Sequence, residues 1–192
     1  MKRKYDISIV IFLIILTVLL TRDHGLMETN FSVLGSRGGR RIGFLLWGAL
    51  VGSMTYLGIA DIADRAGCRD GVLDGFLCLS LYVFLCGIGL PYRSKLLPGM
   101  ARLHVYLSMG GVLLLVCAIC RLLWLLERQY GTEFRMEKYL LILMQIPAAA
   151  LYLYAGIISA LLELYAVCTG WAYLYVLQRK IENLGLSKGG NM

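Results

Sequence analysis

Three side chains of this chain are of the types that can act together as nucleophile, base and orienting acid: Ser32, His104 and Glu163. In the triads of hydrolases, an imidazole takes the proton of a serine hydroxyl, and a carboxylate orients the imidazole. The sequence contains no G-x-S-x-G, H-E-x-x-H or P-loop motif to accompany them. These residue types therefore leave open a hydrolase or transferase that uses His104 and Glu163 as acid–base groups.

Glu163 stands out because of its surroundings. It is the single charged residue in the stretch Tyr139–Gln178, which as one straight helix would be about 60 Å long. The hydrocarbon core of a bilayer is about 30 Å thick, so this stretch predicts two crossings with a reversal near Gly156–Ser159. A carboxyl group inside the second crossing is a functional-site hypothesis. The alternative is a structural ion pair that fixes the register of the helices.

Further polar residues precede and follow the apolar segments. His104, Ser108 and Gly111 have i, i+4, i+7 spacing and so share one helical face, which indicates contact with other helices. His104 is either a satisfied structural histidine or a proton carrier. The sequence predicts that one group of residues lines an outward-facing polar pocket: Glu28, Asn30, Ser32, His104 and Glu163, with Arg102 as a possible counter-charge to Glu163.

The composition determines which elements must position these residues. The chain is 59% hydrophobic and 16% charged, and its mean hydropathy is +0.72, which excludes an ordinary soluble domain. We expect an all-α bundle of six transmembrane helices forming a single domain over residues 1–180, followed by a flexible tail over 181–192. The expected spans are 7–21, 43–62, 72–90, 103–126, 139–155 and 159–178. The connections Arg22–Ile42 and Pro91–Ala101 are expected to be loops, and Gln129–Glu137 a charged connector. The long first loop either folds back over the mouth of the bundle or lies in solvent.

Charge indicates orientation and partners. With both termini cytoplasmic, the majority of the 19 lysines and arginines fall on the inner side, as the positive-inside rule requires. Arg37, Arg40 and Arg41 fall on the outer side and fit this rule poorly. The net charge of +7 is therefore assigned to topology and anionic lipid headgroups, and nucleic acid is not expected as a partner.

Several other features favour packing over chemistry. The six cysteines lie mostly in apolar spans and there are two histidines, so neither a metal site nor a cofactor is predicted. Gly48-x-x-x-Gly52 permits close helix approach, within the bundle or at a homodimer seam. Asp61, Asp64 and Asp74 are read as solvated helix-end charges near arginines, with acid–base work or cation binding as the alternative.

Short motifs in order along the chain resemble a known family. Asn30-Phe31-Ser32-Val33-Leu34-Gly35-Ser36, then Arg40-Arg41-Ile42-Gly43-Phe44, resembles an (I/F)S-x-LG motif after the first helix. Leu103-His104 after Pro98, and Leu162-Glu163 after Gly156, resemble later motifs of the same proteins. The family is the bacterial membrane-protein type known as domain of unknown function 998, distantly similar to DRAM-type and Sfk-type membrane proteins. The resemblance implies six helices and no settled activity. Leu164 and Val33 depart from its pattern.

Three functions fit these observations. The leading prediction is a non-enzymatic multi-pass protein of a plasma membrane, bacterial by the resemblance, that binds or moves a lipid or small amphiphile. The second is an intramembrane hydrolase or transferase using His104 and Glu163. The third is a structural or regulatory subunit whose partner is another membrane protein.

Overall fold

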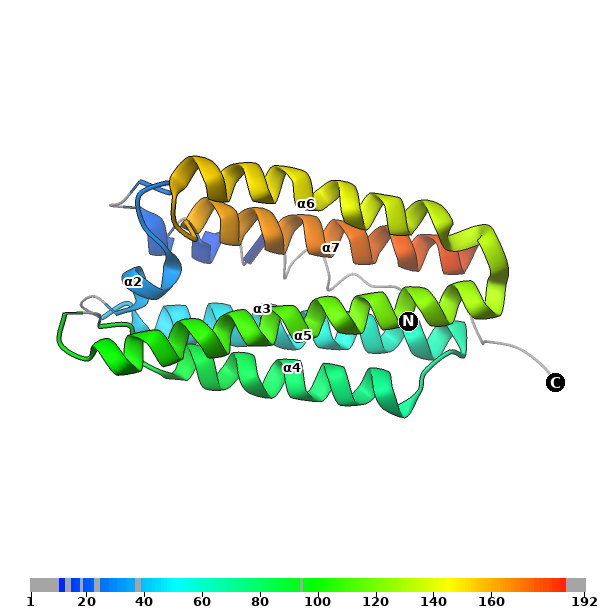
Figure 1. The fold of residues 1–192 in the computed structure, drawn as a ribbon, viewed down its shortest axis with the longest axis horizontal. Coiled ribbons are helices and arrows are strands. Elements are labelled where there is room, and N and C mark those ends of the chain that lie inside the picture. Colours follow the sequence, from blue (N-terminus) through cyan, green and yellow to red (C-terminus); the bar gives the residue numbers. More distant parts are fainter. Residues whose placement is uncertain are drawn as a thin grey trace.

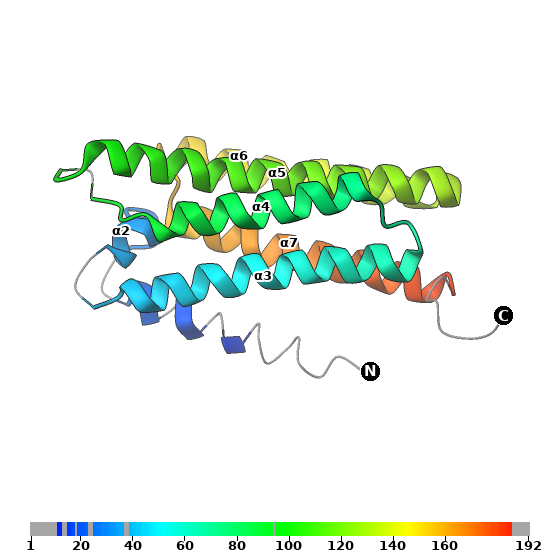
Figure 2. The same ribbon diagram turned by 90° about the horizontal axis from the view of Figure 1, so that it is seen from below.

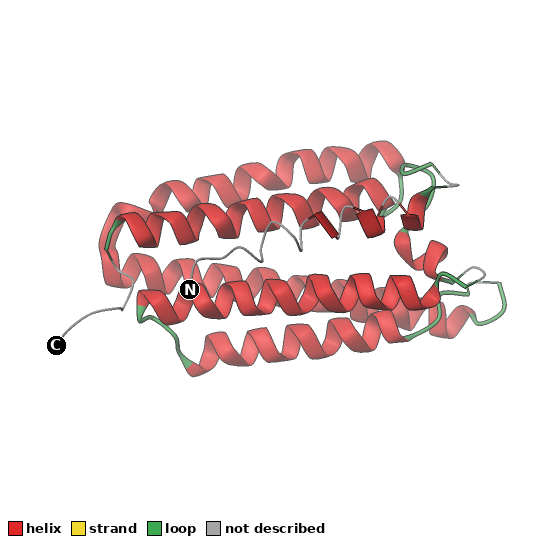
Figure 3. Ribbon diagram, turned by 180° about the vertical axis from the view of Figure 1, so that it is seen from behind, coloured by secondary structure: helices red, strands yellow, loops and turns green. Residues whose placement is uncertain are grey.

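The computed structural model describes residues 11–12, 15–17, 19–22, 25–36, 39–93 and 95–185. The described part of the chain is all-helical and contains no strand (Figure 3). Long helices run side by side along one axis, and a short helix closes one end of the bundle (Figure 1). The elements are α2 (Phe31–Gly35), α3 (Arg41–Ala66), α4 (Gly71–Gly89), α5 (Pro98–Tyr130), the 3-10 turn η1 (Gly131–Phe134), α6 (Arg135–Ala155) and α7 (Ala160–Asn183).

Length and composition identify four helices that can cross a membrane: Arg41–Ala66, Gly71–Gly89, Pro98–Ala155 and Ala160–Asn183. The third contains α5 and α6, which run in opposite directions on either side of η1 (Figure 1). Large apolar side chains cover the outside of the bundle, and Leu153 and Tyr154 are 79% and 81% exposed. Such a surface suits lipid rather than water. The prediction of a multi-pass, all-α membrane protein is confirmed at this level, whereas the count of six spans stays a prediction.

The helices extend past the predicted spans. α3 continues to Ala66 instead of ending at 62, and Arg65 in its last turn pairs with Asp61 at 2.8 Å. The predicted charged connector Gln129–Glu137 is itself helical, because its residues belong to the end of α5, to η1 and to the start of α6. α5 begins at Pro98, inside the expected loop Pro91–Ala101, since proline is well suited to the first turn of a helix.

The predicted first span, 7–21, is described in part. Residues 11–12, 15–17 and 19–21 are helical, and residues 7–10, 13, 14 and 18 lie outside the described residues. The indole N–H of Trp47 donates to the Thr17 hydroxyl at 3.1 Å, and Leu20 is 5% exposed. This segment therefore packs against α3.

The predicted tail, 181–192, is described only to residue 185. α7 continues to Asn183, and Ile181 is fully buried. Its packing carries α7 beyond Gln178, where the last span was expected to end. Residues 186–192 lie outside the described residues.

Glycines bring α4 and α5 into close contact (Figure 2). A Cβ on Gly87 would lie 2.7 Å from the backbone nitrogen of Ser108, and one on Gly111 would lie 2.8 Å from that of Phe84. The Ser80 hydroxyl donates to the carbonyl of Gly111 at 2.8 Å. The predicted small and polar face of His104, Ser108 and Gly111 is therefore confirmed as a helix contact, and it fixes α5 against α4.

The glycine pair of α3 also packs within the bundle. A Cβ on Gly48 would lie 2.8 Å from the Ile88 side chain, and one on Gly52 would lie 3.2 Å from Leu81 and Phe84. These residues belong to α4, so α4 covers this face of α3. The Gly48-x-x-x-Gly52 motif thus serves packing of α3 on α4 rather than a seam between two chains.

Ion pairs gather at the end of the bundle that carries η1, which we call the η1 end. Arg69 pairs with Asp64 at 2.8 Å and with Asp74 at 2.7 Å. Asp70, the N-cap of α4, pairs with Arg121. Asp61, Asp64 and Asp74 are thus partly exposed helix-end charges beside arginines, as predicted, and their ion pairs tie the helix ends together.

Candidate functional site

The opposite end of the bundle, which we call the α2 end, is closed by α2 (Figure 1). Asn30 begins this short helix, because its side-chain oxygen accepts from the Val33 N–H at 2.7 Å. Phe31 and Leu34 are fully buried. The Phe31 ring stacks on Trp47 of α3 with centroids 4.4 Å apart. Of the two alternatives for the long loop after the first span, these contacts favour the one in which it folds back over the bundle.

The segment before α2 and the first turn of α7 satisfy each other's backbone groups. The N–H groups of Ala160 and Leu161 donate to the carbonyls of Thr29 and Leu26 at 2.6 and 3.1 Å. In return, the Glu163 carboxylate accepts from the Phe31 N–H at 2.9 Å. The first N–H groups of a helix have no partner within the helix, so these contacts fix both α2 and α7.

His104 lies at the centre of the α2 end and is 2% exposed. Its Nδ1 lies 3.2 Å from the carbonyl oxygen of Leu90, and its Nε2 lies 2.7 Å from the hydroxyl of Ser32. A carbonyl only accepts, so Nδ1 carries a proton. In the neutral imidazole, Nε2 is then bare and accepts the hydroxyl proton of Ser32. This is the tautomer in which a histidine can act as a base.

The structure brings together part of the predicted pocket. Ser32 and His104 are in direct contact, and Glu163 reaches α2 through Phe31. Glu163 does not complete a triad, because the Leu90 carbonyl takes the position on Nδ1. Within the described chain no ion pair joins Glu163 to Arg102, which is exposed on α5. Glu28 is an exposed turn residue whose N–H donates to the carbonyl of Gly25 at 3.1 Å.

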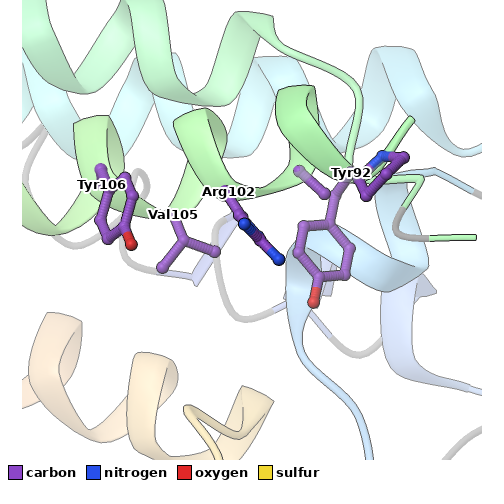
Figure 4. A pocket seen from close by; sticks show the side chains of 6 residues that line it. Tyr92, Arg102, Val105 and Tyr106 are labelled. Carbon is purple, nitrogen blue, oxygen red and sulfur yellow. The ribbon is translucent and has the colours of Figure 1, made fainter.

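A pocket of about 370 Å³ lies beside this cluster, on the first turns of α5 and the preceding loop (Figure 4). Arg102 supplies a guanidinium and two tyrosines supply hydroxyl groups, while the other side chains are apolar. The Tyr92 ring also contacts the His104 ring, with centroids 5.6 Å apart. The pocket and the Ser32–His104 pair therefore share a wall. Its lining residues are Tyr92, Pro98, Ala101, Arg102, Val105 and Tyr106.

Sequence reasoning missed three residues of the α2 end. Arg41 donates to the carbonyls of Gly89 and Leu90 at the end of α4, at 2.5 and 3.4 Å. A cation is favourable beside the free carbonyls of a helix C-terminus, which explains an arginine that fitted the charge rule poorly. Tyr92 and Ser36 are joined by a hydrogen bond from the Tyr92 N–H to the Ser36 hydroxyl at 3.1 Å. No sequence signal linked these residues, because their contacts join distant segments.

Comparisons with known proteins assign no family to the chain. No family model, curated protein or solved structure matches it. The resemblance to the domain of unknown function 998 type stays a prediction. The geometry of the α2 end is therefore what bears on function.

Proposed function

We propose that this multi-pass membrane protein binds a lipid or small amphiphile at its α2 end. The observation that carries the proposal is the pocket of about 370 Å³ beside Arg102. The pocket is open on one side, and it shares with ligand sites a mostly apolar lining in which a few polar groups can orient the ligand. An apolar wall with one guanidinium and two phenol groups suits a molecule with an acyl chain and a polar head.

The charges of the α2 end favour an anionic headgroup. Arg102 is exposed at the pocket, whereas Arg41 is held by backbone carbonyls. A guanidinium binds phosphate or carboxylate through two parallel N–H groups. We therefore assign headgroup recognition to Arg102, with Tyr92 and Tyr106 beside it.

The acyl chain has an apolar path along α5. Tyr106, Met109 and Leu113 follow Arg102 on this helix and are 72%, 42% and 62% exposed. They continue from the pocket toward the middle of the bundle. An acyl chain lying along them would extend into the bilayer while the headgroup stays at Arg102.

The proposal includes a topology of six crossings with both termini cytoplasmic in a plasma membrane, so that the α2 end faces outward. Supporting this count, the described helical residues up to 21 pack against α3, and Pro98–Ala155 reverses direction at η1. Supporting the orientation, Arg65, Arg69, Arg121 and Lys180 lie at the η1 end, where the positive-inside rule places cytoplasmic residues.

Native mass spectrometry of the gently solubilised full chain tests the binding. Wild-type protein should retain a lipid-sized adduct that Arg102→Ala loses. The matched control is Arg93→Ala, because Arg93 is an exposed arginine of the same end that does not line the pocket. Equal loss in both variants would assign the adduct to general charge attraction. No adduct on wild type, or one that Arg102→Ala retains, would overturn the proposed function.

A further inference from the structure

We propose that Ser32 and His104 form a nucleophile–base pair that cleaves an ester bond of an acylated amphiphile at the α2 end. The inference rests on the proposed function, because the pocket beside Arg102 would supply the substrate. It adds an activity, acyl transfer, and names the atoms that perform it. It also replaces the predicted Ser32–His104–Glu163 triad with a different arrangement.

The geometry is that of an activated serine. The hydroxyl of Ser32 lies 2.7 Å from Nε2 of His104, within the reach required of a nucleophile and its base. The third group, which orients the imidazole, is the Leu90 carbonyl at 3.2 Å from Nδ1. Leu90 follows the last residue of α4, and its carbonyl also accepts from Arg41. The orienting group is thus main chain, held in place by a helix end and a guanidinium.

Burial and access are divided between the two side chains. His104 is 2% exposed, which keeps water away from the imidazole, whereas Ser32 is partly exposed. The Tyr92 ring contacts the His104 ring, with centroids 5.6 Å apart, and Tyr92 also lines the pocket. Ser32 is not among the residues that line the pocket, so the reaction requires a molecule held at Arg102 to place its carbonyl carbon past Tyr92, at the partly exposed Ser32 hydroxyl.

Other contacts than the Ser32–His104 hydrogen bond already hold α2 in place. α2 is already fixed by the Phe31 N–H on Glu163, by the Asn30 cap and by the stacked rings of Phe31 and Trp47. What the Ser32 hydroxyl adds is a partner for Nε2 of the buried His104. The pairing with a bare imidazole nitrogen has a direct chemical use.

The reaction balances with water as the second substrate. The Ser32 oxygen bonds to the acyl carbon as its proton moves to Nε2 of His104. The ester carbon–oxygen bond then breaks, and the leaving alkoxide takes that proton, which gives an alcohol and acyl-Ser32. Water next attacks the acyl carbon, giving up a proton to Nε2, and the proton returns to Ser32 as the free acid leaves. A second alcohol in place of water would make the reaction a transfer.

A fluorophosphonate probe with a short alkyl chain tests the nucleophile on the full chain in detergent, with the modified residue located by peptide mass spectrometry. Wild type should be labelled at Ser32. Ser32→Ala should lose the label. His104→Ala and His104→Gln should lower the labelling rate by about 100-fold or more, since a general base contributes about 10²–10⁴-fold. Glutamine keeps a hydrogen-bonding side chain, so its result separates proton transfer from packing.

Ser53→Ala is the matched control, because Ser53 is a partly buried serine within α3 that lies outside the α2 helix and the pocket lining, and its labelling should equal that of wild type. Absence of label on wild type, label on another residue, or an unchanged rate in both His104 variants would overturn the nucleophile–base pair. The Arg102-dependent adduct is scored separately. If the adduct persists but Ser32 is not labelled, the proposed activity is overturned and the proposed binding function stands. If Ser32 is labelled but wild type carries no adduct, the binding function is overturned and the nucleophile–base pair stands.

Discussion

Replacing Gly111 by alanine tests the close contact of α4 and α5, the helices that carry Leu90 and His104. A Cβ at residue 111 would lie 2.7–2.9 Å from the Cβ, N and Cα of Phe84, whereas ordinary contacts begin near 3.4 Å. The two helices must therefore separate by about 0.5–0.7 Å. Overpacking of this kind costs about 1–3 kcal/mol.

The neighbouring Gly110 is the matched control. A Cβ there would lie 3.8 Å from the Val83 side chain, an ordinary contact. Both residues lie inside α5, so the gain of about 1 kcal/mol in helix propensity from glycine to alanine is common to both variants. The difference between them is then the overpacking cost. At about 2–4 °C per kcal/mol for a chain of this size, Gly111→Ala should unfold about 2–12 °C below Gly110→Ala.

Thermal unfolding in one detergent, followed by tryptophan fluorescence, measures this difference. Gly110→Ala should unfold at or above the wild-type midpoint and Gly111→Ala below it. If the two midpoints coincide, or if Gly110→Ala is the less stable, the close contact of α4 and α5 is refuted, and with it the support for the Leu90–His104 contact.

Three further predictions concern single side chains. Phe31→Ala should lower the free energy of unfolding by about 3–5 kcal/mol because the ring is fully buried. The control Tyr154→Ala, at an 81% exposed position, should change it by less than about 0.5 kcal/mol. Chemical denaturation measures both values, and similar values would contradict the docking of α2. The Arg121 guanidinium lowers the pKa of Asp70, so the stability that this carboxylate contributes should be complete above its unfolded pKa of about 3.9 and be lost as pH falls through the lower folded value. Unfolding midpoints followed from pH 6 down to about pH 2 should show this loss in wild type and a flatter profile in Asp70→Asn; identical profiles would refute the pair. Arg41→Ala should lower stability by about 1.5–3 kcal/mol, since charged hydrogen bonds to the last carbonyls of α4 are lost, and unchanged denaturation would contradict that role.

The sequence predicted the helical elements well because hydropathy and length are local properties. The reversal near Gly156–Ser159 is confirmed, since Gly156 has a φ of 65° after α6 and Ser159 caps α7. Helix ends were predicted less well. Ion pairs such as Arg65–Asp61 extend the helices past the apolar stretch, and hydropathy alone does not show such pairs.

The sequence predicted which residue types form part of the candidate site better than it predicted which of them are in contact. Ser32 and His104 meet, although they are 72 positions apart in the chain. The partners of Glu163 and of the imidazole Nδ1 are backbone groups, Phe31 N–H and the Leu90 carbonyl. Every residue type has such groups, so no sequence pattern could identify them. Pairing by side-chain type therefore joined Glu163 to His104 or Arg102, which the fold does not do.

Photo-crosslinking with a diazirine-bearing anionic lipid, mapped by peptide mass spectrometry in membranes, tests most directly whether the α2 end binds an amphiphile. The exposed apolar face of α6, with Leu153 and Tyr154, reports the background from bulk lipid. We predict crosslinks concentrated between Tyr92 and Tyr106, and reduced there by Arg102→Ala but not by Arg93→Ala. Crosslinks spread evenly over α5 and α6, and insensitive to Arg102→Ala, would contradict a lipid site at the α2 end.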